Sequence, residues 1–225
     1  MSAAAVPSPD LLHHLDRAAA WRLLGQIFGY PGEGWRQQLE TLAGCVRDGQ
    51  MAALAQTVAR EGSPELWMRL FGPDGPVRAR AVVWEGGLQP GYLLAELEGY
   101  FQAFGYRAGA DGPPDALPVL LDFAAWLELK LAYAIVQREE EAAGVTGEAP
   151  KTFLERFVSA VAWPVFRQLE ATGPDFLAAA ARTAAMLSGP EPSAQAPAAD
   201  VWPDGSPLED AACETQRERI VQIDP

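Results

Sequence analysis

The chain has 225 residues, of which 49% are hydrophobic, and its formal net charge at pH 7 is −13. This composition supports a sizeable core and argues against a wholly disordered chain. The acidic excess disfavours binding to a phosphate backbone, so we expect no nucleic-acid partner; it favours a partner with basic residues.

The two cysteines, Cys45 and Cys213, are far apart in the chain and form no Cys-x-x-Cys pair. This spacing excludes a disulfide framework and disfavours a cysteine metal site. No basic segment followed by an unbroken apolar run opens the chain, and no uncharged run has the length of a membrane span. We therefore expect a cytoplasmic protein without a membrane span.

Helical signals begin at Ser8, a suitable N-cap residue, which Pro9 and Asp10 follow in the first turn. Apolar residues then recur at helical spacing until a turn at residues 29–32. In the first part of the chain we expect helices over residues 8–28, 35–46, 51–60 and 63–71.

A glycine-rich loop is expected over residues 72–88. Its Ala-Val-Val-Trp run, which ends at Trp84, has the composition of a short strand, but no neighbouring segment offers a partner strand. We therefore predict an ordered loop, followed by a helix over residues 92–104 that ends at Gly105.

The longest predicted helix begins at Asp115, which can cap it, and runs to about residue 142, with Pro118 in its first turn. The helix is apolar most of the way round, which indicates the buried centre of an all-α domain. Asp122 is a lone acid on this helix, so we expect an arginine partner or a place in the wall of a groove.

Two more helices are predicted, over residues 151–172, with a kink at Pro164, and over residues 175–187. Beyond them the composition becomes rich in proline, alanine and acidic residues. We therefore divide the chain into one all-α domain, residues 8–187, and a disordered or loosely docked tail, residues 188–225.

Residues for catalysis or metal binding are sparse. His13 and His14 are adjacent, so their side chains diverge by about 100° on a helix and cannot hold one metal ion from one face. The hydrolase, metalloprotease and nucleotide-binding motifs are absent. We expect neither an enzyme nor a cofactor. An open alternative is a helical small-molecule binder or metal-dependent enzyme in which Asp115 and Asp122, two turns apart on one face, share a carboxylate pocket.

Four segments occur in an order that resembles a known family: LWMRLFGPDG (66–75), AVVWEGG (81–87), LLAELEGYFQAFGY (93–106) and GPPDALPVLLDFAAWLELKLAYA (112–134). The chain resembles the cytoplasmic maturation chaperones of molybdenum enzymes, the TorD/DmsD/NarJ type, over residues 18–187. Those proteins have a Glu-x-Pro-Asp-His-Leu motif at the start of the long helix. Here Pro114 and Asp115 match that motif, whereas Ala116 replaces its histidine and Gly112 its acidic residue.

The resemblance implies a single all-α domain, monomeric or dimeric, that binds the precursor of a molybdoenzyme catalytic subunit, often through its twin-arginine leader, until the molybdopterin cofactor is inserted. We expect a groove with apolar walls and an acidic rim, in which Asp115 and Glu85 meet arginines of the leader. The candidate peptide-binding residues are Leu70, Phe71, Trp84, Glu85, Pro114, Asp115, Asp122, Trp126 and Trp163. A permanent structural subunit of a redox complex is a second alternative.

Overall fold

Helices make up the regular structure of the part of the chain that the computed structural model describes, which is residues 8–84, 90–109, 112–137 and 148–192. Within these ranges there is no strand, only an isolated bridge between Arg80 and Ala116. The expected all-α class is therefore confirmed.

The elements follow the order expected from the sequence. They are α1 (Pro9–Phe28), α2 (Trp35–Ala43), α3 (Gly49–Glu61), α4 (Pro64–Phe71), the 3₁₀ turn η1 (Ala81–Val83), α5 (Pro90–Ala103), α6 (Leu117–Gln137), α8 (Ala149–Phe153), the π-helix η2 (Leu154–Val158), α9 (Ser159–Thr172) and α10 (Asp175–Ser188).

Side-chain caps fix the starts of three helices. The hydroxyl of Ser8 accepts a hydrogen bond from the Leu11 amide at the start of α1. Ser63 does the same for α4, and the Asp48 carboxylate accepts two amide hydrogen bonds at the start of α3. Each cap satisfies backbone donors that the helix itself leaves without partners. The starts at Ser8 and Ser63 were predicted from the sequence, whereas the helix expected over residues 51–60 begins at Gly49, after Asp48.

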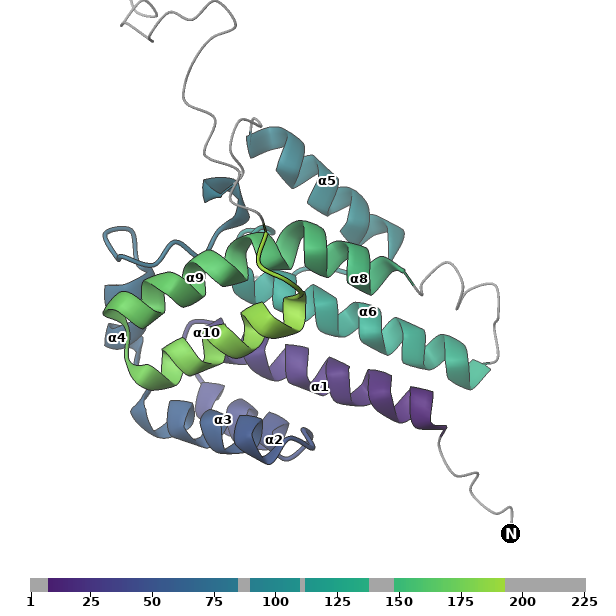
Figure 1. Ribbon diagram of the computed structural model, residues 1–225, viewed down its shortest axis with the longest axis horizontal. Helices are drawn as coiled ribbons and strands as arrows, with labels where there is room; N and C mark the ends of the chain where they lie inside the picture. Colours follow the sequence, from purple (N-terminus) through teal and green to yellow (C-terminus); the bar gives the residue numbers. More distant parts are fainter. Residues whose placement is uncertain (1–7, 85–89, 110–111, 138–147, 193–225) are drawn as a thin grey trace, which may run out of the picture.

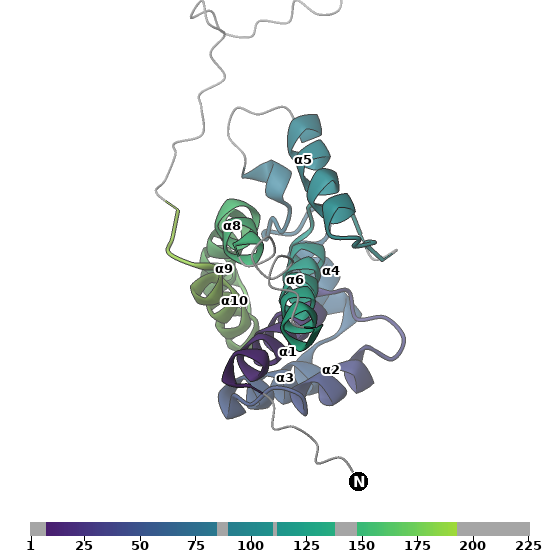
Figure 2. The same ribbon diagram turned by 90° about the vertical axis from the view of Figure 1, so that its right-hand side faces the viewer.

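The helices α1 and α6 lie side by side at the centre of the molecule and run antiparallel (Figure 1). The segment α8–η2–α9 and α10 cover one side of this pair, and α2 and α3 lie on another side, as the rotated view shows (Figure 2). The helix α5 lies along the edge of the molecule near α8. Both α1 and α6 therefore contact other helices on two different sides of the pair.

Burial on most sides of α6 confirms that it is the spine of the domain. Leu120, Phe123 and Leu127 of this helix have no exposed surface. Burying a side chain of this size stabilises the fold by about 1.5–3 kcal/mol. The hydrophobic run after the Pro-Pro-Asp turn is therefore explained by its central position in the core.

Three local features differ from the sequence prediction. The Ala-Val-Val run forms the 3₁₀ turn η1 within the expected loop. The π-helix η2 lies within the helix predicted over residues 151–172. Pro164 lies inside α9, within that predicted helix as expected. The helix predicted over residues 35–46 ends at Ala43.

The first residues of the predicted tail pack against α9. The indole Nε1 of Trp163 donates to the Gly189 carbonyl at 3.2 Å, and the Ser159 hydroxyl donates to the Pro190 carbonyl at 3.2 Å. The packed region therefore continues beyond residue 187, where we placed the domain boundary. Residues 193–225 of the predicted tail lie outside the described ranges.

Close packing of α1 on α6 depends on Gly25. A Cβ at this position would lie 3.3 Å from the Pro118 carbonyl oxygen and 3.6 Å from the Leu121 Cβ. We expect Gly25→Val to reduce the free energy of unfolding by about 2–3 kcal/mol, because the branched side chain would force the two helices apart. Chemical denaturation of both proteins measures this difference.

The matched control is Gly99→Ala on the exposed side of α5, where an added Cβ meets no atom within 4 Å. This substitution should stabilise the protein by about 0.5–1 kcal/mol, since alanine is the better helix former. Equal effects of the two substitutions would contradict a special role for Gly25 in the α1–α6 contact.

Candidate functional site

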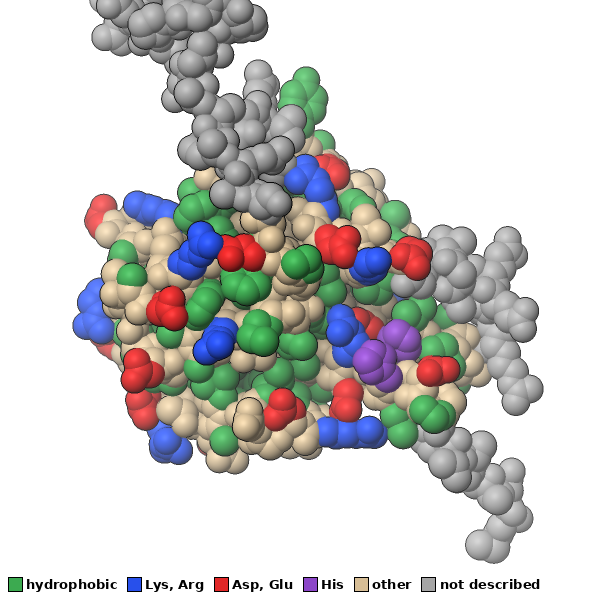
Figure 3. Space-filling view, in the orientation of Figure 1, with side chains coloured by type: hydrophobic (Ala, Val, Ile, Leu, Met, Phe, Trp, Pro, Cys, Tyr) green, Lys and Arg blue, Asp and Glu red, His purple; other side chains and the backbone are tan. Residues whose placement is uncertain are grey.

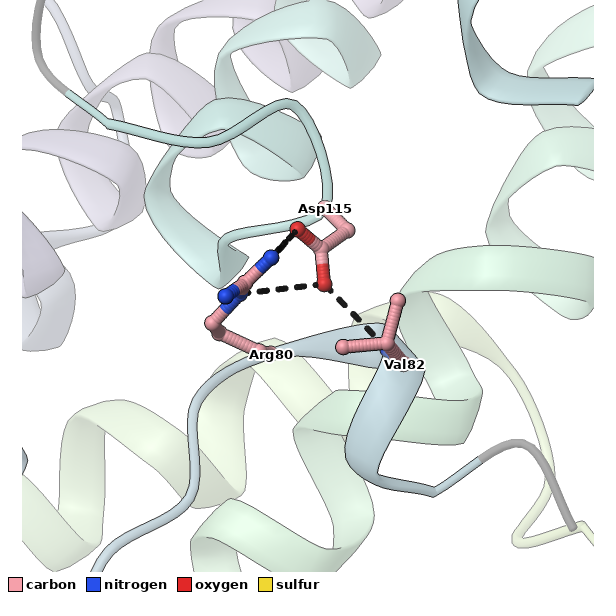
Figure 4. A network of polar contacts seen from close by, with 3 residues as sticks. All are labelled: Arg80, Val82 and Asp115. Carbon is pink, nitrogen blue, oxygen red and sulfur yellow. Dashed lines mark hydrogen bonds and ion pairs between the residues drawn. The ribbon is translucent and has the colours of Figure 1, made fainter. Parts of the chain in front are cut away.

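An ion pair with a fully buried carboxylate joins the loop before η1 to the start of α6 (Figure 4). Asp115 has no exposed surface, and its carboxylate accepts from Arg80 Nη2 at 2.7 Å and Arg80 Nε at 3.1 Å. The amide of Val82 donates to the second carboxylate oxygen at 3.2 Å. Bidentate contacts of this kind fix the relative orientation of the two groups as well as their distance.

Backbone hydrogen bonds reinforce the same junction. The amide of Ala81 donates to the Asp115 carbonyl and the amide of Leu117 donates to the Ala79 carbonyl, each at 2.9 Å. The Pro-Pro-Asp turn and the loop containing Trp84 are therefore held together. The role of Asp115 is different from our prediction, however.

Asp115 neither caps α6 nor offers its carboxylate to a partner. The helix α6 begins at Leu117, and the Asp115 side chain binds Arg80 and Val82 of the preceding loop. The predicted contact with an arginine of a leader is thus replaced by a contact with an arginine of the same chain. Because the carboxylate is fully buried, we assign it a structural role.

An apolar groove lies between α1 and α6, and we call it the α1–α6 groove. Its cavity volume is about 380 Å³. The apolar walls are formed by Leu15, Ala18 and Ala19 of α1 and by Ala125, Trp126 and Leu129 of α6. Leu42 and Cys45, at and just after the end of α2, and Tyr106, after α5, complete the lining. The groove has the size and the apolar character of a ligand-binding cleft.

A polar cluster forms part of the groove lining. Arg22 forms an ion pair with Asp122, and the Tyr106 hydroxyl lies 2.9 Å from the second carboxylate oxygen of Asp122. The Asp122 side chain is 27% exposed. The expected arginine partner of Asp122 and its place in a groove wall are both found in the structure.

The groove continues into a stripe of exposed apolar side chains on α6, which we call the α6 stripe. It consists of Leu129, Tyr133 and Val136, whose exposed fractions are 44%, 60% and 58%. Their spacing of four and three residues places them on one helix face. The groove and the stripe together form an apolar surface longer than the cavity alone.

The predicted peptide-binding residues do not form one groove. Asp122 and Trp126 line the α1–α6 groove, whereas the partly buried Pro114 lies at the Arg80–Asp115 junction. Trp84 is partly buried and its indole donates to the Arg78 carbonyl at 2.9 Å. Glu85 lies outside the described residues.

Three further candidates have mainly structural contacts. Leu70 is 3% exposed and therefore belongs to the core. The ring of Phe71 packs edge-on against Phe28 at 6.3 Å between centroids. Trp163 lies on α9, where its indole binds the Gly189 carbonyl. The spacing of apolar residues predicted that these three residues lie on helices. It did not predict which helix faces pack against each other in the folded chain.

Leu15, Tyr106 and the α6 stripe were not among the predicted site residues. The spacing of Trp126, Leu129, Tyr133 and Val136 along one helix face was a usable signal for the stripe. For Leu15 and Tyr106 no comparable signal exists, because their proximity to α6 arises only from tertiary packing.

Comparison with protein-family models, with curated proteins and with solved structures finds no match to this chain. Over the described ranges, no helix is both long and apolar enough to cross a membrane. Over the same ranges, no three histidine, cysteine, aspartate or glutamate side chains gather in a way that could hold a metal ion.

Proposed function

We propose that this protein is a cytoplasmic, non-enzymatic chaperone that binds the precursor of a molybdoenzyme catalytic subunit through its twin-arginine leader before cofactor insertion. The observation that supports the proposal is the α1–α6 groove with its continuation into the α6 stripe. A leader with an apolar helical segment would bury its apolar face on this surface, in the mode by which amphipathic helices enter apolar grooves.

Electrostatics favour the same partner. The net charge of −13 attracts a segment with two adjacent arginines and accelerates its encounter with the protein. Asp122 already binds one guanidinium, that of Arg22, whose side chain is 52% exposed. An arginine of the leader can therefore exchange with Arg22 at this carboxylate while the apolar part of the leader lies along the groove.

Most of the affinity would come from apolar burial, since one exposed ion pair contributes only about 0.2–1 kcal/mol. We expect Leu129→Arg to weaken the binding of a fluorescent twin-arginine leader peptide roughly tenfold or more, because a charge would then lie in the apolar surface. Fluorescence anisotropy at fixed ionic strength measures the dissociation constant.

The control variant is Met186→Arg on α10, where the methionine is 62% exposed and lies outside the groove lining. It introduces the same charge and should leave the peptide affinity within about twofold of the original protein. Equal weakening by both variants would indicate a general charge effect and contradict a groove-specific contact.

Purification of the tagged full chain from its source cells, followed by mass spectrometry, tests the function itself. We expect a cofactor-free molybdoenzyme catalytic subunit as the main partner. Its absence while such an enzyme is being synthesised would overturn the chaperone proposal, and its presence in the mature enzyme at fixed stoichiometry would indicate a permanent structural subunit. Metal-dependent turnover would instead indicate the enzyme alternative.

A further inference from the structure

A second cavity lies on the opposite side of the α1–α6 pair, facing α8, η2 and α10, and we call it the α1–η2 cavity. Its volume is about 270 Å³. The basic side chains in its lining are His14, Arg17 and Lys151, and the apolar ones include Leu131, Leu154 and Leu187. Figure 3 shows the two histidines on this face with basic and acidic side chains beside them.

A buried carboxylate organises the basic wall. Glu128 of α6 is 2% exposed, and its two oxygens are 2.7 Å from Nδ1 of His14 and 2.6 Å from Nε of Arg17. Both partners come from α1 and are one turn apart. A carboxylate accepts hydrogen bonds, and the Glu128 carboxylate accepts one from Nε of Arg17. This contact fixes the orientation of the Arg17 guanidinium.

The guanidinium of Arg17 is held in a second way. Its Cζ lies 5.9 Å from the ring centroid of Trp21, which is within the range of cation–π attraction. Among the described residues, the two Nη atoms of Arg17 have no hydrogen-bond partner. The guanidinium is therefore oriented before any ligand binds, and its remaining donors match the geometry of a carboxylate.

Two unusual backbone features border the same cavity. The π-helix η2 contributes Leu154, and π-helical turns occur frequently at functional sites. Gly189, at the end of α10, lies in the lining with φ of 123°, a conformation that other residues rarely adopt. The Trp163 indole holds this glycine in place through its carbonyl.

We propose that the α1–η2 cavity binds a small carboxylate with a short apolar chain. The carboxylate of the ligand would accept from the Nη atoms of Arg17 with Lys151 nearby, and the chain would lie on the leucines. Glu155 also contributes to the lining, and its side chain is exposed. This proposal is independent of the chaperone proposal, since the two sites share no lining residue.

Isothermal titration calorimetry of the full chain with hexanoate tests the proposal, with hexanol and inorganic phosphate as comparison probes. We expect one hexanoate to bind per chain, and neither hexanol nor phosphate to bind within tenfold of its affinity. Similar affinities for hexanoate and hexanol would show that the carboxylate is not recognised. Similar affinities for hexanoate and phosphate would show that the apolar wall is not used. Either result would overturn the proposal.

Arg17→Lys should weaken hexanoate binding roughly tenfold, because lysine keeps the charge and the pairing with Glu128 but lacks the second donor edge. Lys151→Ala should also weaken hexanoate binding. Because Lys151 is exposed, this variant tests the site even if Arg17→Lys fails to fold. Arg60→Lys on α3 is the matched control and should leave the affinity unchanged, because Arg60 is 67% exposed and lies outside the cavity lining. Full affinity in both Arg17→Lys and Lys151→Ala would place the ligand elsewhere.

Discussion

Replacing Arg80 with alanine is expected to reduce the free energy of unfolding by about 3 kcal/mol, the lower end of the cost of removing one partner of a buried ion pair, because only the Asp115 side of this pair is buried. The substitution leaves the carboxylate of Asp115, which has no exposed surface, with the amide of Val82 as the one remaining donor among its hydrogen bonds from described residues. The carboxylate then loses the guanidinium that compensates its charge, and only the solvent admitted by the truncated, half-exposed Arg80 side chain can replace it.

The opposite substitution, Asp115→Asn, should cost less, about 1.5–3 kcal/mol, the value of a hydrogen bond to a charged group. The Arg80 side chain is 47% exposed and can be solvated when its partner is lost. Asparagine also retains an oxygen that can accept from Val82. The larger loss of stability is therefore expected from replacing Arg80, although Arg80 is the more exposed of the two residues. Burial of the replaced side chain alone would predict the opposite order.

Urea denaturation of both variants measures the two effects. Arg60→Ala is the matched control, since Arg60 is 67% exposed and its contact with Glu61 is long, 3.9 Å. Its effect should stay within about 0.5 kcal/mol. A smaller loss in Arg80→Ala than in Asp115→Asn would contradict the view that the junction depends on neutralising a buried carboxylate.

The helices were largely predictable because their ends depend on local chemistry. Ser8 and Ser63 act through a hydroxyl that reaches an amide three residues on, and both helices were expected to start at these positions. The π-helix η2 was not predicted, because its sequence, Leu-Glu-Arg-Phe-Val, has the same helical character as its neighbours. What distinguishes it is packing, which a single sequence does not reveal.

The candidate site was predictable only where one helix contains the signal. Asp122 was recognised as an acid in an apolar helix and does have an arginine partner. Asp115 also has one, Arg80, but 35 residues separate the pair, and nothing local linked them. We therefore assigned the Asp115 carboxylate to an arginine of a partner protein, whereas it binds Arg80 of the neighbouring loop.

The α1–α6 pair connects the two cavities physically. Asp122 and Glu128 are six residues apart on α6, and each binds an arginine of α1, Arg22 and Arg17 respectively. One ion pair belongs to the α1–α6 groove and the other to the α1–η2 cavity. The two ion pairs therefore join the same two helices at different points along their length.

Phe123 anchors the wall of the α1–α6 groove to the core, and replacing it with alanine should cost about 3–5 kcal/mol of stability. The residue has no exposed surface, and its ring centroid is 4.7 Å from that of Phe101 and 4.7 Å from that of Phe153. Removal of the ring leaves a cavity that α5 and α8 cannot fill without moving.

The Phe123→Ala substitution should also affect the α1–α6 groove. The Phe123 ring centroid lies 5.1 Å from that of Tyr106, and Tyr106 lines this groove. We expect weaker leader-peptide binding by Phe123→Ala at temperatures where the variant remains folded, because Tyr106 would no longer be held beside Asp122. Tyr133→Ala, at an exposed position of the same helix, should change stability by less than about 0.5 kcal/mol. Circular dichroism during urea denaturation and fluorescence anisotropy measure the two effects separately. Unchanged peptide affinity in the folded Phe123→Ala variant would show that the groove does not depend on this aromatic support.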